Sequence, residues 1–395
     1  MNKIKNIIIS KISSVGKRKY YIDIVCKKSG WSKKKVKKEI NKAQKMGIGY
    51  VQYTRKACWQ KTDKELEFLS KCLAKKRERV LKERQEMIES ICEKSGWSKK
   101  KVIFEWTKAR KKYGASLADY YSFHFWELTE KEQSKFVTLD MFNRMRVKYN
   151  DHYSGVNKFD NKANFNTIFK DFIKRKWFIN KEITYEEFLE KIKDVDSIIA
   201  KTINTTQGKG IHKFNLNECE DKKKLYDKIV KLPKSIVEEY VIQHDDLMDF
   251  CPHSVNTVRI TTLNYNGECK LLYSVLRMGT GAVVDNFHAG GIAAGIDTKT
   301  GIVCTDGGNL DGDVFLVNPY SNKKIRGFQI PFWDEVLDFC NSAYDIVPEV
   351  KLVGWDIAIT KDGIDLIEGN PGADHGVAQI PGNRGLKEIM VDPYL

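Results

Sequence analysis

The chain has 395 residues, of which 42% are hydrophobic and 11% aromatic, a composition typical of a folded protein with a buried core. No apolar run approaches the roughly 20 residues that a membrane-spanning helix needs, and the apolar piece near the start is too short for a signal peptide. Nine cysteines without a CxxC pair indicate reduced thiols. We therefore expect a cytoplasmic protein without a disulfide framework.

The net charge of +16 is distributed unevenly along the chain. Residues 1–150 contain 39 Lys and Arg against 16 Asp and Glu, a net charge of +23, and residues 151–395 have a net charge of −7. A basic face attracts phosphates, anionic lipid or acidic glycan. A solvated, lysine-rich helix surface accounts for the same composition, so the charge alone does not choose between these interpretations.

The N-terminal region repeats itself. The stretch CKKSGWSKKKV at Cys26–Val36 returns as CEKSGWSKKKV at Cys92–Val102. We interpret the repeat as an internal duplication of one basic helical unit. The predicted boundaries are residues 1–82 for the first copy, 83–140 for the second and 141–395 for a further domain.

Each copy reads as helix, turn, helix. Gly30 follows the first helix, where a glycine accepts the left-handed conformation that ends many helices. Thr62 with Glu65, and Thr129 with Glu132, have the spacing of capping boxes that begin further helices.

A helix-turn-helix rich in lysine also suggests a nucleic-acid-binding protein. The lysines, however, lie beside few side chains suited to reading base edges. An αα-hairpin is the simpler interpretation.

From about residue 140 the pattern changes to short β-rich runs separated by glycine turns and helical stretches. This alternation predicts an α+β or mixed α/β domain. The predicted strands are SIIAKTI, SIVEEYVI, TVRITTLNY, KLLYSVLRM, GGIAAGID, KLVGWDIAI and GIDLIEGN.

Two stretches could contact a nucleotide. Lys201 ends a strand, and a loop with Lys209 between Gly208 and Gly210 follows it, so that the backbone and the lysines could approach phosphates. A plain hairpin turn is an equal alternative. The strand in SIVEEYVIQHDD could offer backbone groups to an adenine, and His244 could contact a ribose.

Arg259 lies inside a β-branched strand, where a guanidinium needs an anion beside it. That anion could be a structural carboxylate or a ligand. The stretch RMGTGAVVDNFHAGGI adds Arg277 and a Gly-Gly turn suited to backbone contact with an anion.

The stretch LVGWDIAITKDGIDLIEGNPG predicts a β-hairpin. In it, Asp356 and Glu368 can point to the same face, and Asn370 follows Glu368 at a spacing of two. Two carboxylates and an amide oxygen form a hard oxygen site that suits Mg²⁺. An ordinary surface hairpin with unrelated acids is the alternative, although the apolar residues around Asp356 argue against exposure of the whole strand.

The order of these features resembles the ATP-grasp superfamily, and most closely its sugar-transfer-associated branch. The stretches that carry the resemblance include KYGASLADYYSFHFWEL, NKANFN, VNTVRITTL, HAGGIAAGID and LVGWDIAITKDGIDLIEGN. It covers roughly residues 105–385, and residues 1–82 depart from the usual pattern as an extra copy. The resemblance implies that residues 141–395 form two α+β subdomains that clasp ATP.

The resemblance also implies roles for individual residues. Arg259, Arg277 and His288 would act in catalysis, with the two arginines facing the γ-phosphate and the acyl phosphate. Asp356, Glu368 and Asn370 would bind Mg²⁺. The implied ATP-contacting residues are Lys201, Gln207, Gly208, Lys209, Gly210, Glu238, Glu239, Tyr240, Val241, His244, Asp245 and Asn286.

The implied activity is an ATP-dependent ligase that joins a carboxylate to an amine or related nucleophile through an acyl phosphate. It would take part in biosynthesis or modification of a cell-surface polysaccharide. A kinase that uses the same fold on a hydroxyl, and a nucleic-acid-binding protein led by the basic repeats, are the alternatives. We also expect the basic region to contact an anionic membrane surface or an acidic glycan, at the inner face of the membrane.

Overall fold

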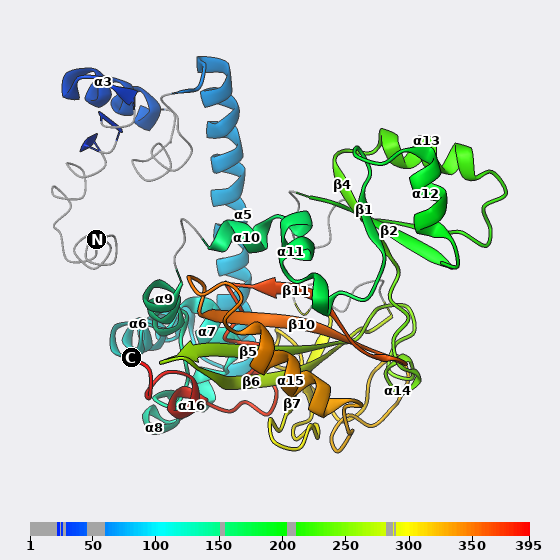
Figure 1. Cartoon of the computed structure of the whole chain (residues 1–395). Coiled ribbons are helices and arrows are strands. Elements are labelled where there is room, and N and C mark those ends of the chain that lie inside the picture. Colours follow the sequence, from blue (N-terminus) through cyan, green and yellow to red (C-terminus); the bar gives the residue numbers. More distant parts are fainter. Residues whose placement is uncertain are drawn as a thin grey trace. The chain divides into compact units, whose positions relative to one another are not determined.

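The computed structural model describes residues 22–23, 25–26, 29–45, 60–150, 155–203, 211–281, 287 and 290–395 (Figure 1). The chain divides into two compact units, Met1–Ile103 and Phe104–Leu395, and each is described by itself. Within the described ranges, no helix is both long and apolar enough to cross a membrane.

The first unit is helical. It contains α3 (Lys33–Lys45), α5 (Asp63–Ser95) and the start of α6 (Lys99–Tyr113). The predicted capping box of Thr62 and Glu65 begins α5, and Gly96 in the left-handed conformation follows its end. The predicted boundary between residues 82 and 83 falls inside this continuous helix, so no linker separates the two repeats at that point.

The two repeats make the same local contacts. In each, a serine donates a hydrogen bond to the carbonyl oxygen four residues earlier, a glycine has a positive φ, and a lysine lies over a tryptophan ring. These residues are Ser29, Gly30, Lys35 and Trp31 in the first repeat, and Ser95, Gly96, Lys101 and Trp97 in the second. Two copies of one unit would share such contacts, and the internal duplication itself stays a prediction.

The second unit contains a four-stranded sheet in the order β1-β4-β2-β3. Helices α12 and α13 cover it, and their apolar side chains form a core with Phe178, Ile198 and Val237. The elements are β1 (Trp177–Ile179), α12 (Tyr185–Ile192), β2 (Ser197–Thr202), β3 (Ile211–Asn215), α13 (Lys222–Lys231) and β4 (Ser235–Glu239).

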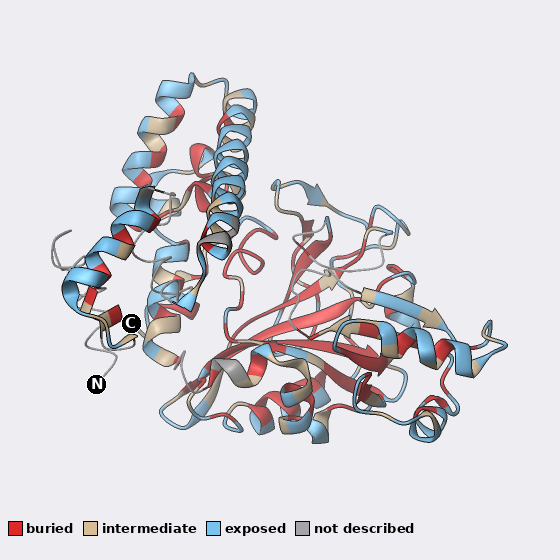
Figure 2. Cartoon of the chain, turned by 90° about the horizontal axis from the view of Figure 1, so that it is seen from above, coloured by how far each residue is buried: buried red, intermediate tan, exposed pale blue. Residues whose placement is uncertain are grey.

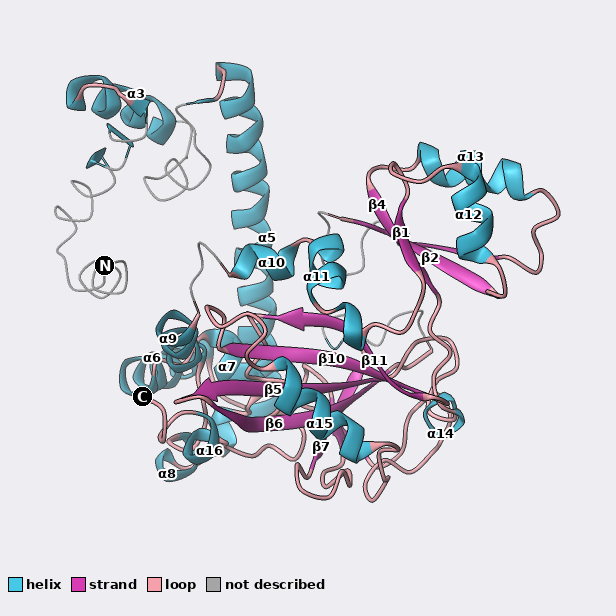
Figure 3. Ribbon diagram, in the orientation of Figure 1, coloured by secondary structure: helices cyan, strands magenta, loops and turns pink. Residues whose placement is uncertain are grey.

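The second unit also contains a seven-stranded antiparallel sheet in the order β11-β10-β5-β6-β7-β8-β9 (Figure 3). Its strands are β5 (Thr257–Tyr265), β6 (Glu268–Met278), β7 (Ile292–Ile296), β8 (Gly307–Gly308), β9 (Val314–Phe315), β10 (Leu352–Thr360) and β11 (Gly363–Asn370). All seven strands predicted from the sequence of this unit have a counterpart in one of the two sheets.

Helices and 3₁₀ turns complete the unit. They are α7 (Leu117–Ser122), η2 (Phe125–Glu127), α8 (Glu130–Gln133), α9 (Leu139–Tyr149), α10 (Val156–Asp160), α11 (Lys162–Ile168), η3 (Lys170–Phe172), α14 (Asp245–Met248), α15 (Trp333–Ala343) and α16 (Lys387–Met390). The predicted capping box of Thr129 and Glu132 begins α8. Figure 1 shows α15 lying across the strands of the large sheet.

The large sheet has one apolar face and one polar face. The apolar face, called the core face here, packs against α10, α11 and α15 through a cluster that includes Phe159, Phe169, Phe339 and Trp355. Asp356 and Arg259 alternate with these apolar residues along β10 and β5 and therefore point to the opposite face, which is called the site face. Figure 2 shows that the central strands are buried along most of their length.

Arg175 connects the two sheets. Its Nη2 lies 2.7 Å from Oε1 of Glu238 on β4, and its Nη1 lies 2.9 Å from Oδ1 of Asp365 on β11. All three side chains are buried. Burial by itself would raise the pKa of Glu238, but the charges of Arg175 and then Lys201 outweigh it, so that the pKa lies well below the usual value.

Replacing Arg175 with Met should destabilise the second unit by about 3–5 kcal/mol, because two buried carboxylates lose their shared cation. Denaturant unfolding measures the change. The triple variant R175M/E238Q/D365N should recover much of the loss, because it removes the stranded charges. A loss as small as that of an exposed change such as Lys234→Met would contradict this account of the link.

Candidate active site

The predicted hairpin of β10 and β11 is present, and it brings three polar side chains together. Asp356 lies directly opposite Glu368 in the register of the two strands. Nδ2 of Asn370 donates a hydrogen bond to Oε1 of Glu368 over 2.9 Å. The arrangement agrees with the spacing in the sequence, which predicted that the three side chains share one face.

A β-bulge beside Asp356 decides which other residues join this face. Asp356 pairs with Glu368, whereas the next residue, Ile357, pairs with Leu366, so that β11 has one extra residue at Ile367. The bulge turns Leu366 toward the core face, although it lies two residues from Glu368. Asp365 consequently faces the site side, where it binds Arg175.

Two arginines hold Asp356. Arg259 on β5 lies opposite Asp356, donates from Nε to Oδ1, and donates from Nη2 to Oδ2 over 2.6 Å. Nη1 of Arg277 on β6 lies 2.9 Å from the same Oδ2. Burial would raise the pKa of Asp356, but the charges of Arg259 and Arg277 outweigh it and keep the carboxyl ionised. The structural carboxylate is thus the partner that the sequence left open for Arg259.

Glu368 has a different environment. Its side chain is exposed at the end of the strand, while the surrounding protein partly desolvates the carboxyl group. This desolvation, followed by the negative charge of Asp356, raises the pKa of Glu368 above its usual value. A cation between the two carboxylates would relieve their repulsion. The donor set of carboxylate and amide oxygens fits Mg²⁺, which prefers oxygen ligands.

Lys201 lies near the end of β2, as predicted, and its Nζ is 2.7 Å from Oε2 of Glu238. The Lys201 side chain is 22% exposed, so its ammonium group remains accessible from one side. Glu238 was predicted to line the adenine and hinge, and that assignment stays a prediction. Its side chain points inward, where Asn166, Arg175 and Lys201 bind the two carboxylate oxygens.

The segment after β4 connects the two sheets and carries the other predicted nucleotide contacts. Glu239 accepts a hydrogen bond from the backbone N–H of Lys176, and the Tyr240 ring lies 3.4 Å from Nζ of Lys213. The backbone N–H of His244 donates to Ile359 on β10. Val241 is half-buried and Asp245 is exposed at the start of α14.

Several predicted residues lie outside the described ranges. They are Gln207, Gly208, Lys209 and Gly210 in the glycine loop, and Asn286 and His288 in the second loop. Their assignment to ATP and to catalysis stays a prediction.

The sequence did not identify Arg175, although its guanidinium forms ion pairs with two buried carboxylates. The only available signal was a run of three basic residues, Lys174-Arg175-Lys176, between the apolar residues of FIKRKWF. Such a run is common on protein surfaces and does not by itself indicate a buried ion pair.

Comparison with known proteins identifies the family. The sequence profile of the sugar-transfer-associated ATP-grasp family matches residues 141–392. A search of the curated proteins found no match.

Solved structures that resemble the chain include N5-carboxyaminoimidazole ribonucleotide synthetase in its ADP complex, with 14% identity, a TM-score of 0.36, and coverage of 56% of this chain and 47% of that one. The ATP-grasp ligase PsnB, in a complex with minimal precursor, Mg and ADP, has 16% identity and a TM-score of 0.33. The match covers 57% of this chain and 54% of PsnB. D-alanyl-alanine synthetase A from Vibrio cholerae has 10% identity, a TM-score of 0.34, and coverage of 59% of both chains. The matched part of this chain thus spans only about half of each of these proteins.

The profile covers well over half of the chain. The chain belongs to the sugar-transfer-associated ATP-grasp family.

Proposed function

We propose that the protein is an ATP-dependent ligase that joins a carboxylate to an amine, or to a related nucleophile, in the biosynthesis or modification of a cell-surface polysaccharide. The observation that carries the proposal is the site face of the large sheet. There, the oxygen donors Glu368 and Asn370 lie beside Asp356, which two arginines hold. The sugar-transfer association of the family supports a polysaccharide as the setting.

The chemistry has two steps. In the first, a carboxylate oxygen of the substrate attacks the γ-phosphorus of ATP, the bond to the bridging oxygen breaks, and ADP leaves. In the second, the amine nitrogen attacks the acyl carbon, inorganic phosphate leaves with the former carboxylate oxygen, and the nitrogen loses a proton. A carboxylate is a poor acylating agent, and its conversion to an acyl phosphate makes it a good one. No covalent enzyme nucleophile is therefore required.

Different residues of the chain would serve the metal, the reacting phosphate and the nucleotide. Glu368, Asn370 and Asp356 would hold Mg²⁺, which would offset the charge that develops as two anions meet. Arg259 and Arg277 keep Asp356 ionised, and their positive charge would stabilise the transferring phosphate. Lys201 would contact the phosphates from the small sheet.

The reaction type can be tested by ATP turnover with a panel of uronic acids, amino acids and amines, followed by mass measurement of the product. A ligase yields an amide or a related acyl product together with ADP and phosphate. A stable phosphate ester of a sugar hydroxyl would favour the kinase alternative instead.

Glu368→Gln should lower Mg²⁺-dependent ADP release by at least about 100-fold. A neutral amide binds Mg²⁺ more weakly than a carboxylate does, so the charge of the transition state would lose the stabilisation that Mg²⁺ gives it. Glu368 is the cleaner test than Asp356, since Asp356 also holds two buried arginines. Asp362→Asn in the exposed turn of the same hairpin is the matched control. Turnover near the native level in Glu368→Gln would remove the metal assignment.

Lys201→Ala should weaken binding of Mg·AMPPNP by about tenfold or more, because a charge-assisted contact to phosphate is lost. Titration calorimetry measures the affinity. Lys234→Ala is the control, since Lys234 pairs with Glu182 on the surface of the same small sheet. Lys213 is unsuitable as a control because its ammonium lies over Tyr240. Equal affinities of the Lys201 and Lys234 variants would argue against a nucleotide role for Lys201.

We also propose that the basic first unit docks the protein on an anionic surface, such as the inner face of a membrane or an acidic glycan. Helix α3 presents Lys34, Lys37 and Lys38 to solvent, while Val36 and Ile40 face its core. Each lysine near an anionic surface contributes about 1 kcal/mol at low salt. This attraction falls off over about one Debye length from the surface, and the Debye length shortens as the salt concentration rises.

The triple variant K34Q/K37Q/K38Q should bind phosphatidylglycerol vesicles or hyaluronan less tightly at low salt and keep its ATP turnover. A control with Lys191, Lys193 and Lys231 changed to Gln removes the same charge from exposed positions of the second unit. Co-sedimentation over a salt series provides the measurement. If both triple variants bind like the native chain, the lysines have only the role of a solvated helix surface.

A further inference from the structure

Arg384 lies over the site face of the large sheet, and the chemistry proposed above does not use it. It comes from the C-terminal segment that follows Asn370. Its Nη2 is 2.6 Å from the position that a Cβ atom on Gly295 would occupy. The guanidinium can therefore lie directly on β7 only because this position is a glycine.

Gly295 belongs to the same row of the sheet as the proposed metal ligands. Residues that are directly opposite on neighbouring strands point to the same face. The row runs across five strands through Glu368, Asp356, Arg259, Val275 and Gly295. Neighbouring strands are about 4.8 Å apart, so the three steps from β10 to β7 amount to about 14 Å. Arg384 thus lies at the opposite end of this row from the metal ligands.

The charge of Arg384 has no carboxylate partner among the described residues. Its Nη1 makes only a weak contact with Sγ of Cys304 over 3.8 Å, and its buried Nε makes no hydrogen bond. Arg175 and Arg259, by contrast, each bind carboxylates. A half-buried guanidinium that no described carboxylate neutralises is available to an anionic ligand.

The chain that leads to Arg384 borders the row. Ala373 packs on Gly354 of β10. A Cβ atom added to Gly354 would lie only 2.6 Å from the Cβ atom of Ala373. The hydroxyl of Tyr273 on β6 donates to the carbonyl oxygen of Asp374 over 2.7 Å. Gly354 lies two residues before Asp356 on β10, and Tyr273 lies two residues before Val275 on β6. Both therefore lie on the site face. The segment therefore crosses the site face beside the row before it reaches Arg384.

We propose that Arg384 binds a carboxylate or phosphate group of the substrate, and that the substrate is an anionic saccharide longer than one sugar ring. This inference rests on the proposed function, because it takes the reacting group to lie at the metal end of the row. A guanidinium is suited to this task, since its planar fork binds either oxyanion with two parallel hydrogen bonds. The length of the row sets the separation between the reacting group and the recognised anion.

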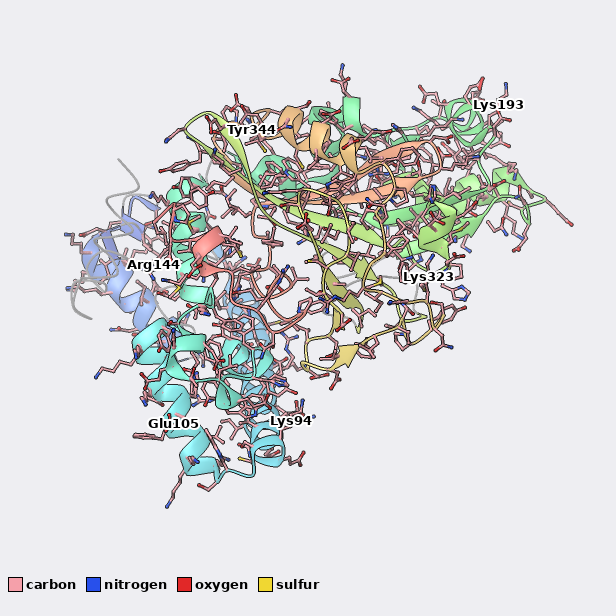
Figure 4. All side chains as sticks on the ribbon, turned by 90° about the horizontal axis from the view of Figure 1, so that it is seen from below. Lys94, Glu105, Arg144, Lys193, Lys323 and Tyr344 are labelled. Atoms are coloured by element: carbon pink, nitrogen blue, oxygen red, sulfur yellow. The ribbon has the colours of Figure 1, made fainter. Side chains whose placement is uncertain are left out.

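The test measures saccharide binding to the full chain saturated with Mg·AMPPNP, so that it does not depend on turnover. All proteins in this test, including the one called native, carry K34Q/K37Q/K38Q and are compared at a salt concentration that suppresses binding of hyaluronan to the basic first unit. The probes are hyaluronan tetrasaccharide for carboxylate, UDP-N-acetylglucosamine for phosphate, and maltotetraose as a neutral control. The variants are Arg384→Gln, Arg384→Lys and Gly295→Ala. The last keeps the charge but displaces the guanidinium from β7. Arg144→Gln is the matched control, because Arg144, labelled in Figure 4, is 60% exposed and pairs with Asp140.

The native chain should bind at least one charged probe, and the probe that binds identifies the carboxylate or the phosphate. Arg384→Gln and Gly295→Ala should weaken that binding about tenfold or more, Arg384→Lys less, and Arg144→Gln not at all. Thermal unfolding should show that Arg384→Gln keeps the native Tm, since no carboxylate loses a partner. Failure of the native chain to bind either charged probe, or equal binding by Arg384→Gln, would overturn the assignment. A chain that binds the probe but forms no acyl product would count against the proposed ligase reaction and not against Arg384.

Discussion

A guanidinium buried between two sheets is tolerated only when carboxylates surround it, and Arg175 meets this condition with one carboxylate from each sheet. Glu238 belongs to the small sheet and Asp365 to the large one, so the ion pairs connect the elements that carry the two halves of the site. The same Glu238 also binds Lys201. The position of the predicted phosphate-contacting lysine therefore depends on the link between the sheets.

The two faces of the large sheet differ in composition: the core face packs the hydrophobic core, and the site face carries the candidate site. Aromatic residues from α10, α11 and α15 pack around Trp355 on the core face, where Nε1 of Trp355 donates to Thr262 over 2.9 Å. The site face carries the charged groups. The bulge at Ile367 makes the division possible, because it allows Leu366 to join the core while Glu368, two residues later, stays on the site face.

The electrostatics of the site follow from how the charges are shared. Arg259 and Arg277 both bind Asp356, whereas Glu368 accepts a hydrogen bond from Asn370 and forms no ion pair with a described residue. The pKa of Asp356 is consequently lowered and that of Glu368 raised. Two neighbouring carboxylates with opposite shifts form a site that gains from a bound cation. The arginines also bring positive charge to the strands next to the proposed metal ligands.

Much of the fold and part of the site could be predicted from local patterns. The strand TVRITTLNY has the same bounds in the sequence and in the structure, because its β-branched residues leave few alternatives. The capping boxes at Thr62 and Thr129 also depend only on neighbouring residues. The hairpin with Asp356, Glu368 and Asn370 followed from strand alternation and a tight turn. By contrast, the inward orientation of Glu238 could not be predicted, since it depends on Arg175, which is distant in the sequence.

The sequence by itself determined the family, the order of the strands along the chain, the hairpin and the uneven distribution of charge, because each rests on residues that are close together in the chain. Only the tertiary structure decided the partners of the buried charges. Arg175 with Asp365, Arg259 with Asp356, and Arg384 with Gly295 each join residues that are about 90 or more positions apart. Their pairing depends on strand register, on one bulge and on the absence of a side chain at one glycine, and none of these can be read from local alternation of apolar and polar residues.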